Sequence, residues 1–191
     1  MKIRYLLLVL WLIVALVTAL DAQTDAKTYA DEAQHFTVSY PADFRVVAKP
    51  AADGGLFDDE VLGTKVFKAV ATKIPKKYQG TVVLEIWVSS NANAKCGEAD
   101  AADEPDSIAK TKMIGGKTFY GYSDSSGGMG GSSYLSAYRG MVKGKCWQLR
   151  MISAQSKLTA SGEDVVPTPF DPKILEKTLY NFVDSFKYTG K

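Results

Sequence analysis

His35 is the only histidine in the 191-residue chain, and it is the side chain best able to act as a general base near neutral pH. A hydrolase built on His35 would also need a nucleophile and an orienting acid, and no such partner lies at a recognisable spacing. The G-x-S-x-G motif of the α/β-hydrolases is absent. We therefore predict no catalytic residue. A small secreted hydrolase using His35 with a serine or an acid remains the enzymatic alternative.

Metal and cofactor sites are not indicated either. Two cysteines and one histidine cannot complete a closed zinc site if the cysteines are bridged. The loop at 91–106 is acidic but lacks the D-x-[DN]-x-[DN]-G pattern of a calcium loop. The run 127–131 lacks GxxxxGK[ST] and precedes a predicted strand, so no helix N-terminus is available for a phosphate. We predict no metal and no cofactor. The acids of the loop are Glu98, Asp100, Asp103, Glu104 and Asp106.

Residues 1–22 are typical of a secretory signal peptide. Lys2 and Arg4 precede an uncharged apolar run at 5–20, and cleavage could follow Ala19 or Ala22. The run is shorter than the roughly 20 residues of a membrane-spanning helix. An uncleaved signal anchor is the alternative, and it would be the chain's only contact with a membrane. The prediction is an exported protein, periplasmic or extracellular, with a polar tether at 23–34 and a single domain at 35–191.

Export determines how the two cysteines are interpreted. Cys96 and Cys146 both follow the signal segment, and an oxidising compartment favours a disulfide between them. A redox pair would more often have the close spacing of CxxC. We therefore predict a structural bridge.

The best-defined structural feature is a hairpin over 134–153. Alternating side chains flank Lys143-Gly144, and Gly144 can supply the positive φ that a two-residue turn needs. This turn pairs Val142 with Lys145, so paired residue numbers sum to 287. One face is then mainly apolar and the other mixed, as in a half-buried antiparallel sheet. The register also places Trp147 opposite Gly140, where we expect the indole to cover the glycine.

Further strands follow from alternation and turn signals. They are predicted at 35–41, 44–48, 61–74, 81–90 and 117–123. Both faces of 81–90 are largely apolar, which predicts an interior position in the sheet. Residues 107–113 are predicted as a turn of helix, and 157–169 as a polar loop. Near the end of the chain, Asp171 and Pro172 predict the start of a helix. Phe170, just before it, is predicted to pack against Leu175 as a hydrophobic staple. The apolar stripe of the helix comprises Ile174, Leu175, Thr178, Leu179, Phe182 and Val183.

Two segments carry a family resemblance. The opening FTVSYPADFRVV and the closing VDSFKY resemble the ends of the PsbP/Mog1-like group of small α/β/α sandwich domains. With the elements above, the resemblance implies an α+β fold in which a mainly antiparallel sheet packs against a C-terminal helix. Because neither segment is a catalytic signature, the resemblance implies a non-catalytic binding or assembly-support role.

The candidate partner surface is the glycine-rich tip and the tyrosines beside it. Loops that lack bulky side chains often carry function, and exposed tyrosines are typical of contact surfaces. We also expect most tyrosines to lie in the core. The partner would be an unknown envelope protein or a small ligand. Nucleic acid is not expected, since the formal net charge is +2 and no basic block occurs. The candidate residues are Gly127, Gly128, Met129, Gly130, Gly131, Tyr134 and Tyr138.

Overall fold

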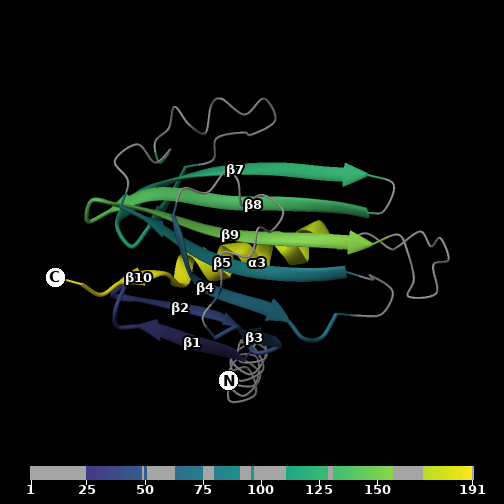
Figure 1. The fold of residues 1–191 in the computed structure, drawn as a ribbon, viewed down its shortest axis with the longest axis horizontal. Coiled ribbons are helices and arrows are strands. Elements are labelled where there is room, and N and C mark those ends of the chain that lie inside the picture. Colours follow the sequence, from purple (N-terminus) through teal and green to yellow (C-terminus); the bar gives the residue numbers. More distant parts are fainter. Residues whose placement is uncertain are drawn as a thin grey trace, which may run out of the picture.

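In the part of the chain that it describes, the computed structural model contains two β-sheets and one helix (Figure 1). It describes residues 25–48, 50, 63–74, 80–90, 96, 111–128, 131–156 and 170–190. Within these residues the strands are β1 (Ala26–Asp31), β2 (Phe36–Pro41), β3 (Phe44–Val46), β4 (Thr64–Ala71), β5 (Gly80–Ser89), β6 (Thr111–Ile114), β7 (Lys117–Gly128), β8 (Gly131–Val142), β9 (Lys145–Ser156) and β10 (Lys187–Tyr188), and the helix is α3 (Pro172–Ser185).

The large sheet has seven strands in the order β3-β4-β5-β9-β8-β7-β6, and the small sheet has the order β1-β2-β10. All paired strands are antiparallel. Helix α3 lies behind β5 and β9 in the view of Figure 1. The predicted α+β fold, a mainly antiparallel sheet with a packed C-terminal helix, is confirmed.

The main core lies between one face of the large sheet and the layer formed by α3 and the small sheet. Alternate residues of β5 enter it, and α3 contributes Leu179, Phe182 and Val183. Trp147 of β9 is fully buried there, with ring centroids 5.2 Å from Phe186 and 5.5 Å from Phe36. Aromatic packing of this kind contributes a large share of the buried apolar area in a small domain. The helix and the small sheet therefore cover one side of the large sheet.

The hairpin prediction is confirmed in register and turn. Val142 pairs with Lys145, and Lys143 and Gly144 both have positive φ, 50° and 73°. The prediction that the Trp147 indole covers Gly140 is wrong. A Cβ at Gly140 would lie 2.6 Å from the ring of Phe119, which faces it from β7. Phe119, rather than Trp147, therefore occupies the space over this glycine.

Three local predictions need correction. Ala26–Asp31, expected within the tether at 23–34, forms strand β1 and pairs along its whole length with β2. Thr111–Ile114, expected as part of a helical turn, forms the edge strand β6. The strand predicted at 117–123 continues beyond Ser123 and ends at Gly128, as β7. In each case pairing with a neighbouring strand outweighs a weak local preference. The loops predicted at 91–106 and 157–169 lie outside the described residues, apart from Cys96.

The helix begins as predicted. Asp171 is the N-cap, its carboxylate accepts a hydrogen bond from the Lys173 backbone N–H at 2.9 Å, and Pro172 is the first helical residue. The predicted stripe is only partly buried, because Ile174 is 61% exposed. Ser185 ends the helix and its hydroxyl accepts from the Ser39 N–H at 2.8 Å, which ties the helix to β2.

Candidate functional site

His35 is exposed in the turn between β1 and β2, where its φ of 58° is left-handed. Its ring centroid lies 6.5 Å from that of Tyr188, and its carbonyl accepts from the Thr189 N–H at 2.7 Å. No hydroxyl or carboxylate of the described residues is hydrogen-bonded to its imidazole. A general base must be within hydrogen-bond reach of the proton it takes, so this geometry provides no nucleophile–base pair at His35.

The predicted partner surface separates into two environments. Tyr134 is 54% exposed, whereas Tyr138 is 5% exposed and its ring centroid lies 6.4 Å from that of Tyr180 on α3. Tyr138 is therefore a core residue, and its assignment to an exposed surface is wrong. Gly127 is exposed and Gly128 pairs with Gly131 at the end of the hairpin. Met129 and Gly130 lie outside the described residues.

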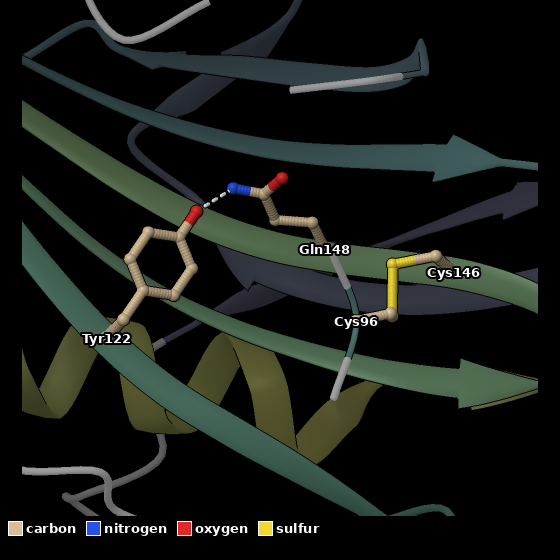
Figure 2. The surroundings of a disulfide bond; sticks show 4 residues. All are labelled: Cys96, Tyr122, Cys146 and Gln148. Carbon is tan, nitrogen blue, oxygen red and sulfur yellow. Dashed lines mark hydrogen bonds between the residues drawn. A yellow bond between two sulfur atoms is a disulfide. The ribbon is translucent and has the colours of Figure 1, made fainter. Parts of the chain in front are cut away.

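The disulfide between Cys96 and Cys146 is formed, with a Cα–Cα distance of 5.8 Å. Both cysteines are buried. Cys146 lies two residues before Gln148 on β9, and Figure 2 shows the bridge near Gln148, whose amide points away from it toward Tyr122. The bridge therefore joins residue 96 to the middle of the large sheet, on the face that bears Gln148 rather than the face that packs on α3.

A buried ionic cluster lies on that same face, and we call it the Glu85 cluster. The carboxylate of Glu85 accepts from Arg150 Nε at 2.7 Å and from Trp87 Nε1 at 3.0 Å, and Lys65 Nζ lies 3.2 Å from its second oxygen. The side chains of Lys65, Glu85 and Arg150 are 2%, 3% and 0% exposed. Burying charges to this degree is tolerated only when they are paired and hydrogen-bonded.

A β-bulge builds this cluster. The register between β4 and β5 shifts between Lys65 and Phe67, so one strand has an extra residue there. Lys65 and Lys68, three residues apart, would otherwise point to opposite faces. With the bulge, both lysines approach Glu85, and Lys68 Nζ lies 4.0 Å from Oε1 of Glu85. A period-two pattern read from the sequence does not reveal this arrangement.

A second group of side chains adjoins the Glu85 cluster, and we call it the Tyr122 cluster: Tyr122, Ala137, Arg139 and Gln148. Tyr122 and Arg150 pair with Ala137 from either side, and Arg139 pairs with Gln148. The guanidinium carbon of Arg139 lies 3.9 Å from the Tyr122 ring centroid. Gln148 Nε2 donates to the Tyr122 hydroxyl (Figure 2). The small Ala137 leaves room for these longer side chains to meet above it.

The described side chains of the Glu85 and Tyr122 clusters supply N–H donors, aromatic faces and one carboxylate, Glu85, that is already engaged by cations. The sequence indicates a mixed face for β8 and β9 and places Glu85 and Trp87 together on β5. It does not predict that five strands, β4, β5, β7, β8 and β9, bring these residues together in two adjoining clusters, because that requires the sheet order and the β4 bulge.

Two tyrosines with shifted pKa values belong to the other side of the sheet. A hydrogen bond to the Glu176 carboxylate, at 2.8 Å, and then burial raise the pKa of Tyr180 strongly. Burial, followed by the charge of Asp31, raises the pKa of Tyr29. Both effects favour the neutral phenol. Neither residue contacts the polar clusters, so these shifts concern stability rather than binding.

Within the ranges that the structure describes, no three histidine, cysteine or acidic side chains come together as metal ligands. The helix in this part of the chain is not long and apolar enough to cross a membrane.

The fold resembles solved structures, although no protein-family model and no curated protein matches the sequence. A protein from Bacteroides thetaiotaomicron matches with a TM-score of 0.50 and 10% identity over 86% of this chain and 49% of that one, so this chain spans about half its length. Mycobacterium tuberculosis LpqN, described as involved in cell envelope biogenesis, has a TM-score of 0.46 and 11% identity, over 89% of this chain and 94% of that one. PsbP from Synechocystis has a TM-score of 0.46 and 13% identity, over 86% of this chain and 93% of that one. The match to the Bacteroides protein is a likeness of fold alone.

Proposed function

We propose that the protein is an exported, non-catalytic binding or assembly-support module of the cell envelope, and that it contacts a protein partner through Tyr134 and the glycine-rich tip. The observation that carries the proposal is the position of Tyr134, which is 54% exposed on a regular strand. Its cross-strand neighbours are Ser125 and Ser153, so no bulky side chain stands beside it in the ladder. Exposed, rigidly held aromatic residues are the usual anchors of protein interfaces.

The sheet edge beside Tyr134 supports a protein partner over a small ligand. Among the described residues, β6 pairs only with Lys117–Tyr120 of β7, and the rest of β7 pairs on one side only, with β8. A strand with one unpaired side can accept an extended segment of another protein through backbone hydrogen bonds. Ser123, Ser125 and Ser126 are exposed along this edge, and their small side chains leave the backbone accessible.

Export is supported by the sequence and by the disulfide. The features of residues 1–22 favour a cleaved signal, and an oxidising compartment would maintain the Cys96–Cys146 bridge. Because β1 begins at Ala26, cleavage after Ala19 or after Ala22 would leave the small sheet whole. Mass spectrometry of the exported protein tests this point: an N-terminus at residue 20 or 23 supports cleavage, and one at residue 1 refutes it and favours the signal-anchored alternative.

The enzymatic alternative rests on His35 and is not favoured by its surroundings, as described above. A non-catalytic role requires only the binding surfaces already described. The mutation His35→Ala provides the comparison: the binding proposal expects it to leave partner retention unchanged.

The test of the proposed function is retention of an envelope component on the immobilised protein. Tyr134→Ser removes the aromatic anchor, and Ile174→Ser is the matched control, because Ile174 is 61% exposed on α3. We expect one or more components to be retained by the wild type and by Ile174→Ser but lost with Tyr134→Ser. Equal retention by all three proteins, or none by the wild type, would overturn the proposal.

A further inference from the structure

The Arg139 guanidinium is a buried cation of the polar face that has no acidic partner among the described residues. Arg139 is 8% exposed, and its Nη2 is fully shielded and without a hydrogen-bond partner in the described structure. Among the described residues, the guanidinium contacts the ring of Tyr122. A π face attracts a cation but accepts none of the five N–H bonds of a guanidinium in the plane where they point.

The neighbouring carboxylate does not supply the missing acceptor. Glu85 already accepts from Arg150 and Trp87 on one oxygen and faces Lys65 and Lys68 with the other. Gln148, opposite Arg139, directs its amide N–H to the Tyr122 hydroxyl. A buried charge without a counter-ion or hydrogen bonds is costly to a fold, which makes this arrangement a candidate for completion by a bound anion.

The site lies near an exposed part of the same face. Met141 follows Arg139 by two residues on the same face of β8 and is 48% exposed. Tyr120, the partner of Arg139 on β7, is half-buried. Arg139 therefore lies two residues from an exposed position of the polar face.

We propose that Arg139, held by Tyr122 and Gln148, forms a binding site for a small oxyanion, a carboxylate or a phosphate group. A guanidinium offers two parallel N–H bonds to either group, and the bonds are charge-assisted. Stacking on Tyr122 fixes the plane of the guanidinium, and the Gln148 hydrogen bond fixes the tyrosine. This site is separate from the Tyr134 surface and stands whether or not that surface binds a partner.

Ligand-dependent stabilisation of the full chain tests the site. Sodium phosphate and sodium succinate are titrated at constant ionic strength against sodium chloride, and the midpoint of thermal unfolding, Tm, is measured. We expect at least one oxyanion to give a saturable rise of about 5–10 °C at a hundredfold excess over its Kd. Phosphate and succinate separate the two chemical sources. A Tm that depends on ionic strength alone would overturn the proposal and leave a water molecule as the partner of Nη2.

Variants assign the effect to Arg139. Arg139→Met keeps the length of the side chain but removes its charge and donors, and we expect at least a tenfold loss of affinity. Arg139→Lys keeps the positive charge but lacks the two parallel N–H donors of a guanidinium, and it should weaken binding less than Arg139→Met. Arg45→Met is the control, because Arg45 is exposed on β3 at the other end of the sheet order. Saturation that is unchanged in Arg139→Met would overturn the assignment.

A spectroscopic measurement covers the case in which Arg139→Met fails to fold. In the wild type, the arginine Nε–Hε resonance absent from the Arg139→Lys spectrum belongs to Arg139. We expect the bound oxyanion to shift this resonance along the same saturation curve as Tm, and an unmoved resonance refutes the site. Tyr134→Ser should keep the whole response, so failure of the oxyanion site and failure of the proposed partner surface are distinguishable.

Discussion

Glu85 and Arg150 face each other across β5 and β9, and both Nε and Nη2 of the arginine lie 2.7 Å from the same carboxylate oxygen. With Lys65 at 3.2 Å from the other oxygen, the carboxylate holds two buried cations. The pair lies on the face of the large sheet that points away from α3. Substitution of Glu85 therefore tests whether the side chains of that face are packed as part of the fold.

Glu85→Gln should strongly destabilise the protein. The change leaves Arg150 and Lys65 buried without the charge that offsets their desolvation, and we expect a loss of about 3–5 kcal/mol in the free energy of unfolding. Urea denaturation measures it. The control is Asp184→Asn, which removes the exposed pair with Lys112 and should cost less than about 1 kcal/mol. Similar losses in the two variants would show that the Glu85 cluster is solvated.

The disulfide should contribute to stability through the unfolded state. Cys96 and Cys146 are separated by 50 residues, and closing a loop of that length restricts the unfolded chain by about 4 kcal/mol in the chain-entropy model. The double variant Cys96→Ser, Cys146→Ser should therefore unfold at lower urea concentration than the oxidised wild type. Free thiols at both positions in peptide maps of the exported protein would contradict the bridge.

Gly140→Ala should introduce a steric conflict with Phe119. The added Cβ would lie 2.6–2.8 Å from three ring carbons, and overpacking of this kind costs about 1–3 kcal/mol. Gly127→Ala is the control, because its nearest heavy atom would be 3.8 Å away. Phe119→Leu combined with Gly140→Ala should recover part of the loss relative to the sum of the single changes. Strict additivity in urea denaturation would show that the ring does not restrict position 140.

Tyr180 should make the protein sensitive to alkaline pH. Its pKa in the folded state is raised above the ordinary value of 10.0, first by the hydrogen bond to Glu176 and then by burial. The stabilisation is therefore complete below about pH 10 and is lost as the pH rises above it, where the unfolded chain ionises and the folded chain does not. Tyr180→Phe should lose stability less steeply over this range. Equal slopes of urea midpoint against pH in the two proteins would count against the shift.

Local chemistry explains which parts of the fold the sequence predicts. The hairpin follows from one turn and strict alternation around it, and the helix follows from Asp171, Pro172 and an apolar stripe. Strand β1 carries few apolar residues in a polar stretch and forms because β2 offers it a partner. A single-sequence pattern cannot supply that partner.

The candidate site was predictable only in part. The exposure of Tyr134 agrees with the predicted surface, whereas Tyr138 lies on the same strand at a point that α3 covers through Tyr180. Tyr122, Arg139 and Gln148 come from three strands, and their meeting depends on register and on the small Ala137 between them. The alternation of side chains predicts the mixed face, but it does not predict that these three side chains meet.

Site-specific crosslinking in the native compartment tests the central claim most directly, namely that the protein binds an envelope partner through Tyr134. A photoreactive phenylalanine analogue is placed at position 134, and the same analogue at position 174 serves as an equally exposed control on α3. The account predicts a discrete crosslink to another envelope protein from position 134 and none from position 174. Absence of a crosslink from position 134, or the same products from both positions, would contradict it.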